Sequence, residues 1–268
     1  MMAITRRPRR RINPAEAIAD ELRSRILSGE VPDGGVLPKL EDLIEEFGAS
    51  KVIVRQACHI LETEGLVRVR RGNVGGSEVH VPQPANAAYV VGQVLEARQV
   101  RTADVAAAVA RFEPLCAELC AERKDRKRTV LPALRAAQRD LAACIDAGDG
   151  EGAALASRQW HEALVSNCGN ETTVVLLGTL EAVWSTHATA AAAELTARGE
   201  PLSPELSRRV HAEHQEIEAL IAAGDGPGAA AAAREHLRTA RIHRSQAVDD
   251  APVRAVTVRD ELFGWRGR

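Results

Sequence analysis

The sequence predicts a mainly α-helical protein with two parts: three helices followed by a short β-hairpin, and then an all-α helical bundle. Three observations lead to this prediction. The chain has 268 residues, which is long enough for two domains. Hydrophobic residues make up 45% of it, enough to fill real cores and to exclude wholesale disorder. Aromatic residues are only 3% while alanine is abundant, which favours closely packed helices over a β-sandwich.

Residues 1–13 are predicted to form a flexible basic arm. Five arginines stand close together in it, namely Arg6, Arg7, Arg9, Arg10 and Arg11. Such an arm can follow the phosphate backbone of DNA or enter a minor groove. A frayed terminus without a fixed role explains it equally well. No apolar run follows the arginines, so they are not expected to belong to a signal peptide.

Two helices are expected next along the chain. The first covers residues 14–28, with Asn13 as its N-cap and proline at the first helical position. A turn-rich link follows at residues 29–35. The second helix covers residues 39–47 and ends at Gly48, a residue type suited to the end of a helix.

The third predicted helix, residues 51–64, separates apolar from polar side chains clearly. Its apolar stripe is Ile53, Val54, Ala57, Ile60 and Leu61, and its opposite face carries Lys51, Arg55, Cys58 and Glu62. Ser50 is a suitable N-cap, because its hydroxyl can accept from a first-turn N–H that has no helical partner. A helix with its apolar side in a core and two cations on its first exposed turns suits a DNA major groove. The alternative is a surface helix with a solvated charged face.

A short hairpin is expected after this helix, because residues 66–70 and 78–81 alternate in side-chain character like two strands. The loop between them is predicted to be mobile and positively charged, and it contains Arg70, Arg71, Gly72, Asn73, Val74, Gly75 and Gly76. Glycines let the backbone approach DNA closely, and the two arginines can neutralise phosphates or enter a narrow minor groove. The alternative is a plain solvated hairpin.

Several residues of this first part match a known pattern in the correct order. They are Gly29, Gly34, Leu37 and Pro38, then Ser50, Lys51, Val54, Arg55, Gln56 and Ala57, then Leu61, Gly65, Leu66 and Val67, and finally Gly75 and Gly76. The segment resembles the winged helix-turn-helix of GntR-type bacterial regulators. This resemblance implies that DNA is bound by Ser50, Lys51, Arg55, Arg70, Arg71, Asn73 and Gly75.

Three positions depart from the family pattern. Lys51 replaces the usual Arg, and Gln56 replaces the usual Glu. Glu41 stands where relatives of the FadR type often carry an Arg that contacts DNA. The resemblance therefore implies DNA binding, while these positions are expected to change individual contacts.

Pro82 and Pro84 mark the boundary between the two parts, which places the winged helix-turn-helix domain at residues 14–82. Residues 83–248 are expected to form an all-helical domain, because no stretch in them alternates like a strand. Helical patterns run near 85–98, 103–124, 130–147, 151–167, 171–197, 204–223 and 227–247. Residues 249–268 show little periodicity and are left as an unassigned tail.

Three of the eight histidines lie on apolar stripes of different predicted helices: His161, His214 and His236. Three imidazoles on three helices of one bundle can converge on a metal ion in its core. The alternative is that each ring is half-buried and satisfied by a backbone carbonyl or a water molecule. Periodicity alone favours this second interpretation.

The second part also resembles the helical ligand domain of FadR-type GntR regulators, called the FCD domain. The matching segments are SRQWH (157–161), EHQEIEALIAAGD (213–225) and REH (234–236). The resemblance implies effector binding and dimerisation by residues 83–248. It also implies a divalent metal such as zinc or nickel held by His161, His214 and His236.

Two departures bear on that implied site. The family's fourth ligand is an Asp, and this chain has Ser157, whose neutral hydroxyl is a far poorer ligand for a dication. The second departure concerns an Arg that is common in the family four residues before a Glu. This chain keeps the Glu as Glu113, but Val109 stands at the position of the Arg. The expected effector pocket therefore consists of Ser157, His161, His214, His236 and Glu113, and its metal is in question.

Composition and motifs exclude several other classes of protein. The formal charge is −2 overall, and residues 1–81 contain 13 Lys and Arg against 12 Asp and Glu, so DNA binding depends on local placement of charge. Five cysteines without a C-x-x-C pair indicate reduced thiols in a cytosol. No stretch has the uncharged length needed to span a bilayer. No nucleophile-elbow, phosphate-loop or H-E-x-x-H motif is present, so an enzyme is not expected.

These observations predict a cytoplasmic, ligand-responsive, sequence-specific transcription regulator. By family resemblance it is a homodimer that binds a palindromic operator on double-stranded DNA and acts as a repressor released by a small organic acid, a carboxylate. Two other classes remain open. One is a helical metal-dependent enzyme fused to a DNA-binding head, and the other is an architectural DNA binder without an effector.

Overall fold

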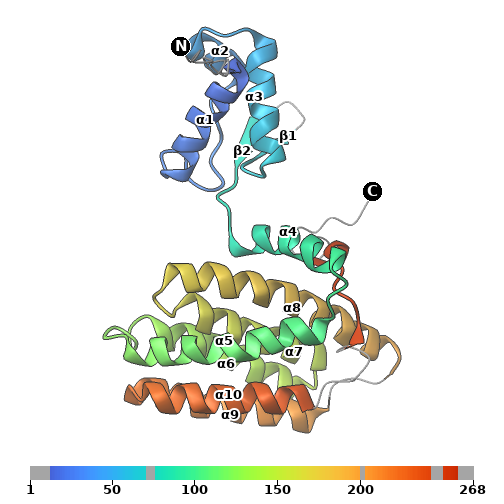
Figure 1. Cartoon of the computed structure of the whole chain (residues 1–268). Coiled ribbons are helices and arrows are strands. Elements are labelled where there is room, and N and C mark those ends of the chain that lie inside the picture. Colours follow the sequence, from blue (N-terminus) through green and yellow to red (C-terminus); the bar gives the residue numbers. More distant parts are fainter. Residues whose placement is uncertain (1–12, 71–75, 200–202, 243–249, 259–268) are drawn as a thin grey trace, which may run out of the picture. The chain divides into compact units, whose positions relative to one another are not determined.

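The computed structural model describes residues 13–70, 76–199, 203–242 and 250–258 (Figure 1). The chain divides into two compact units, residues 1–82 and residues 83–268. Each unit has its own hydrophobic core. The mainly α-helical fold class predicted from the sequence is confirmed, and the only sheet in the described residues has two strands.

The first unit contains three helices and a hairpin: α1 (Pro14–Leu27), α2 (Leu40–Phe47), α3 (Lys51–Thr63), β1 (Val67–Arg70) and β2 (Gly76–Val79). Local signals determine where these helices begin and end. The side chain of Asn13 accepts from the backbone N–H of Ala15, and the hydroxyl of Ser50 accepts from the N–H of Ile53. Gly48 ends α2 in the left-handed conformation, with φ of +58°, which glycine adopts without steric conflict.

Helix α3 packs on α1 and α2 through the apolar stripe predicted for it. Val54, Ala57 and Leu61 are fully buried in the core of this unit. One prediction on this helix was wrong, because Cys58 was placed on the exposed face. Its side chain is half-buried against the same core, and burial raises the pKa of its thiol. The residue follows Ala57 directly, so it lies at the edge of the buried stripe.

The hairpin is antiparallel, with Val67 opposite Val79 and Arg70 opposite Gly76. The second strand begins at Gly76, two residues before the predicted start. A Cβ atom at Gly76 would lie 2.8 Å from a methyl group of Val36, so a larger residue here would have to displace that side chain. Residues 71–75, including the predicted DNA-binding residues Arg71, Asn73 and Gly75, lie outside the described residues, as do residues 1–12 of the predicted arm.

The second unit is built from helices in its described part. They are α4 (Pro84–Ala97), α5 (Thr102–Glu122), α6 (Val130–Ala147), α7 (Gly150–Ser166), α8 (Glu171–Ala197), α9 (Pro204–Ala223) and α10 (Gly226–Ile242). Helix α5 packs against α8, α9 and α10, and α7 packs against α6 and α8. Asp149 and Asp225 cap α7 and α10 by accepting from the N–H groups of Gly152 and Gly228.

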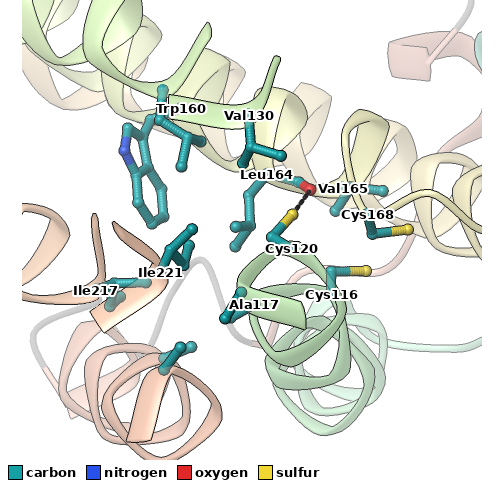
Figure 2. Close-up of a cluster of buried hydrophobic side chains, with 14 of the residues drawn as sticks. Cys116, Ala117, Cys120, Val130, Trp160, Leu164, Val165, Cys168, Ile217 and Ile221 are labelled. Carbon is teal, nitrogen blue, oxygen red and sulfur yellow. Dashed lines mark hydrogen bonds between the residues drawn. The ribbon is translucent and has the colours of Figure 1, made fainter. Parts of the chain in front are cut away.

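The largest core of the second unit lies where α5, α6, α7 and α9 meet (Figure 2). Trp160 is fully buried there, with Leu164 from the same helix and Ile217 and Ile221 from α9. Figure 2 also shows the thiol of Cys120, which donates to the carbonyl oxygen of Leu164 at 3.3 Å. Burial raises the pKa of Cys120, so the thiol stays neutral and packs as a small apolar group.

The described part of the unassigned tail, residues 250–258, takes part in the fold of the second unit. Residues 250–258 pack against α4 and α8, and Val253 and Val258 are fully buried in a small separate core. The backbone N–H of Arg254 donates to Nε2 of His187 at 2.8 Å, and the N–H of Ala255 donates to the carboxylate of Glu96 at 2.9 Å. This C-terminal segment therefore fastens α4 to α8.

Among the described helices, none is both long enough and apolar enough to cross a membrane.

Candidate functional site

Three imidazoles converge inside the second unit, one from each of α7, α9 and α10. Nε2 of His236 lies 3.3 Å from Nε2 of His161 and 3.3 Å from Nε2 of His214. The ligand atoms of all three lie within 4.8 Å of one another. Two nitrogens bound to a tetrahedral zinc ion at about 2.0–2.1 Å are themselves about 3.3–3.4 Å apart. The two short separations therefore suit a shared metal ion.

Carboxylates determine which nitrogen of two of these rings carries the proton. Glu113 on α5 accepts from Nδ1 of His161 at 2.5 Å, and Glu213 on α9 accepts from Nδ1 of His236 at 2.7 Å. With the protons on Nδ1, the Nε2 atoms of His161 and His236 present lone pairs to each other. When both rings are neutral, these two lone pairs can bind one cation together. A carboxylate on the outer nitrogen is also the arrangement that orients histidine ligands in metal sites. These residues therefore fit a divalent metal.

The third ring, His214, is held by stacking. Its ring lies 3.9 Å from the ring of Trp160, with an angle of 5° between the two planes. Trp160 is itself fixed, because its indole N–H donates to the carboxylate of Glu218 at 2.9 Å. Nδ1 of His214 is buried without a hydrogen-bond partner among the described residues. Stacking on a fully buried indole thus positions this imidazole without a hydrogen bond to its outer nitrogen.

Burial and neighbouring charges decide the protonation of the cluster. The pKa of His214 lies well below its usual value, first because the ring is buried and then because three other imidazoles, those of His236, His161 and His211, lie near it. Burial also lowers the pKa of His236, despite the hydrogen bond to Glu213. Burial acts the same way on His161, but the charge of Glu113 and the hydrogen bond to it prevail and raise that pKa. His214 and His236 are thus held in the neutral form that binds metals.

A further carboxyl group, from α8, lies near His161. Glu181 is only 6% exposed, and its burial, followed by the nearby charge of Glu113, raises its pKa. One oxygen of Glu181 and one of Glu113 are buried without a hydrogen-bond partner in the described part of the chain. A bound cation near His161 would favour the charged form of Glu181.

The structure places the remaining predicted effector-site residues as follows. Ser157 lies on α7, one turn before His161, and its side chain is half-buried. Glu113 belongs to the cluster as the hydrogen-bond acceptor of His161. Val109 is 2% exposed and packs in the main core, so an apolar contact occupies the position where the family commonly has Arg.

Sequence reasoning missed four residues of this cluster: Trp160, Glu181, Glu213 and Glu218. Two of them carried a signal in the matched segments, because Trp160 and Glu213 stand directly before His161 and His214. Residues adjacent to a ligand on a helix point in other directions, so neither was assigned a role. Glu218 lies within the matched segment 213–225 but at a position to which the family pattern gives no role, and Glu181 lies on a part of α8 that carries no motif. Only the packing of the helices identifies them.

The predicted DNA-binding face belongs to α3 in the first unit. Lys51 and Arg55 are exposed there, and the first turn of the helix contains no acidic side chain. Ser50 caps the helix as expected from the sequence. Arg70 ends β1 and pairs through its backbone with Gly76. The exposed start of α3 combines positive side chains with the positive end of the helix dipole, which suits phosphates.

Both units match known families. Residues 104–239 match the family described as FCD domain. Residues 14–75 match the family described as bacterial regulatory proteins, gntR family. The first match covers the helices that carry all three histidines, and the second covers α1 to α3.

Individual relatives match mainly in the first unit. The HTH-type transcriptional regulator Mce2R of Mycobacterium tuberculosis is 39% identical over 59 residues, 22% of this chain and 25% of that protein. The HTH-type transcriptional repressor NanR of Klebsiella aerogenes is 34% identical over 70 residues, 26% of this chain and 27% of that protein. The chain thus matches about a quarter of the length of these curated relatives.

One solved structure extends the likeness over most of the chain. The structure described as Streptococcus agalactiae GntR has a TM-score of 0.63 to this chain and is 23% identical. The similarity covers 85% of this chain and 99% of the other. At this level of identity it shows that the two chains share a fold.

Proposed function

The chain belongs to the GntR family of bacterial regulatory proteins that carry an FCD domain, and from this premise we propose that it is a ligand-responsive, DNA-binding transcription regulator. The observation that carries the proposal is the convergence of His161, His214 and His236 within the segment that matches the FCD family. The family consists of regulators, so the cluster is assigned to effector recognition and no catalytic step is assigned to it.

The cluster is proposed to hold a divalent metal such as zinc or nickel. His161, His214 and His236 would be the protein ligands, and Glu113 and Glu213 would orient two of the rings. A bound ion supplies a concentrated positive charge that can attract an anionic group. Three histidines leave positions for exogenous ligands, and Ser157 is too weak a ligand to compete strongly for them.

A small organic acid is the proposed effector, because a carboxylate suits the charge of such a site. The proposed mechanism has two states. A homodimer holds two copies of α3 on the half-sites of a palindromic operator. An effector that binds one conformation of the helical unit more tightly shifts the population toward it and changes DNA affinity. Release of a repressor is the proposed direction, and the similarity to the transcriptional repressor NanR supports it.

A direct experiment uses the full chain after removal of metal with a chelator. Nickel is added while the tryptophan fluorescence of the chain is followed, because one of its three indoles, that of Trp160, stacks on His214. Binding sites are selected from random double-stranded DNA, and a panel of mono-, di- and tricarboxylates is then tested on the selected complex at fixed salt. We expect nickel to change the fluorescence, and at least one acid to weaken DNA binding.

The His214→Ala variant is the matched control, because it removes a ligand but keeps the DNA-binding unit. It should still bind the selected DNA, while its response to nickel and to the acid is lost. Failure to select any DNA sequence would contradict the regulator assignment. An acid response that persists in His214→Ala would place the effector elsewhere, and no response to any carboxylate would exclude the proposed effector class.

A further inference from the structure

Val52 is the most exposed of the large hydrophobic side chains in the described residues, with 74% of its surface accessible. It is the second residue of α3 and lies between two exposed residues, Lys51 and Gln56, on the polar side of the helix. A single exposed valine on an arbitrary surface needs no explanation. The position of Val52 at the start of the proposed DNA-binding helix is what sets it apart.

The local structure fixes where this side chain lies. The hydroxyl of Ser50 accepts from the N–H of Ile53, so the helix begins at Lys51 and Val52 belongs to its first turn. Residues three, four and seven positions later share its face of the helix. These are Arg55, Gln56 and His59, and all are exposed. The buried residues Val54, Ala57 and Leu61 occupy the other side of the helix, in the core.

Helix stability does not account for a valine here. β-Branched residues lose side-chain freedom in a helix and are poorer helix formers than alanine or the long polar residues. An exposed valine also gains no burial in return. The side chain therefore stabilises neither the helix nor the core of the first unit in the free protein.

The chemistry of the major groove offers one partner for such a group. Base edges in the groove present hydrogen-bond donors and acceptors, and the C5 methyl of thymine is the apolar group among them. The first residues of a recognition helix are those that contact base edges. We propose that Val52 contacts the C5 methyl group of a thymine in each operator half-site and so sets specificity there. This inference rests on the DNA-binding function proposed above.

The test replaces thymine by deoxyuridine, which lacks only the C5 methyl group. Each thymine of the selected operator is replaced in turn, symmetrically in both half-sites, and affinity is measured by fluorescence anisotropy at fixed salt. Burying one methyl group contributes about 0.8 kcal/mol, a factor of about four in affinity. At one thymine position in each half-site, we expect the affinity of the parent protein for the operator to fall about fourfold for each methyl group removed.

The Val52→Ala variant tests the same contact from the protein side. It should bind the thymine operator about fourfold more weakly per half-site, and its affinity should no longer depend on that methyl group. Alanine favours helix, so the variant should keep its fold, as circular dichroism can verify. Leu27→Ala is the matched control, because Leu27 is 59% exposed on α1 of the same unit. This control should retain the full methyl dependence.

Three results would overturn the inference and leave the proposed function standing. In the first, the parent selects an operator but no deoxyuridine substitution weakens binding. In the second, Val52→Ala keeps the same dependence on the methyl group as the parent. In the third, Leu27→Ala loses that dependence as well. Selection of no DNA sequence by the parent would instead overturn the proposed function, and this inference with it.

Discussion

At the scale of single residues, neighbours decide what each functional group can do. His161 and His236 each have a carboxylate on Nδ1, whereas His214 has none and is held by the ring of Trp160. Three chemically identical side chains therefore reach the same cluster with different protonation preferences. On α3, by contrast, Arg55 is exposed, and its guanidinium is available to a partner outside the chain.

Replacing Arg55 by Ala should weaken specific DNA binding by about 1–3 kcal/mol if the guanidinium reads a base. The core face of α3 is unchanged, so fold and assembly should be intact. The measurement is an operator titration at fixed salt, with Arg139→Ala on the exposed face of α6 as the matched control. Equal operator affinities for parent and Arg55→Ala would contradict this role.

Replacing Ser157 by Asp should tighten metal binding and weaken binding of an anionic effector. The new carboxylate attracts the dication and supplies a harder oxygen ligand, and it competes with the effector for the same positive charge. Metal content after dialysis and calorimetric titration measure the two effects. Ser157→Asn is the matched control, because asparagine is similar in size to aspartate but carries no charge. An equal gain in metal affinity for both variants would show that charge is not the cause.

At the scale of elements, the C-terminal segment shows how a hydrogen-bond pattern fastens helices together. His187 on α8 donates through Nδ1 to the carbonyl of Val183, and its Nε2 accepts from the N–H of Arg254. Only the neutral ring can do both, because a protonated imidazole has no acceptor. The hydrogen bond that joins α8 to residues 250–258 therefore depends on the protonation of one side chain.

Acid should accordingly weaken the second unit. Burial lowers the pKa of His187 in the folded protein, and the hydrogen bond to the carbonyl of Val183 and the nearby charge of Glu96 only partly oppose this. The unfolded chain then binds the proton more readily, so the contribution of His187 to stability is complete above the ordinary pKa of 6.5. It is lost as the pH falls below that value. Besides Glu96, the charged side chain of Arg254 also lies beside this contact.

The free energy of unfolding is measured by chemical denaturation between pH 7.5 and pH 5.5. This range extends about one pH unit to either side of the ordinary histidine pKa. His187→Gln is the matched variant, because an amide can donate to Val183 and accept from Arg254 without titrating. The variant should lose less stability than the parent over this range. Identical pH dependence in both proteins would contradict the role given to His187.

At the scale of the whole molecule, two units with separate cores are joined in one chain. A single head reads few base pairs, so a regulator of this design is expected to bind DNA as a two-fold dimer. Light scattering at micromolar concentration should therefore give twice the mass of the 28.8 kDa chain. A monomer in both the free state and the operator complex would contradict this expectation.

A metal bound by the three histidines should stabilise the second unit alone. Ligand at a hundred times its dissociation constant adds about 2.7 kcal/mol to the free energy of unfolding of the unit that binds it. Calorimetry of the full chain should then show the transition of the helical unit moving to higher temperature with zinc, while that of residues 1–82 stays in place. The His214→Ala variant should show no shift, and a shift that persists in it would point to another site.

The sequence by itself determined where most helices begin and end. The signals for these limits are local: Asn13 and Ser50 accept first-turn N–H groups, and Gly48 adopts the left-handed conformation. Apolar spacing of three and four residues likewise identified the buried face of α3, because a helix repeats over a short stretch of chain. The family resemblance also selected His161, His214 and His236, which the structure brings together.

Only the tertiary structure decided which groups surround those histidines and what the end of the chain does. Glu113 and His161 are 48 positions apart, Glu213 and His236 are 23 apart, and Arg254 meets His187 across 67 positions. No local pattern records such pairs, because they depend on how whole helices pack against one another. Burial is decided in the same way. It makes Cys58 part of a core edge and raises the pKa of Glu181. The sequence around each of these residues does not predict its burial.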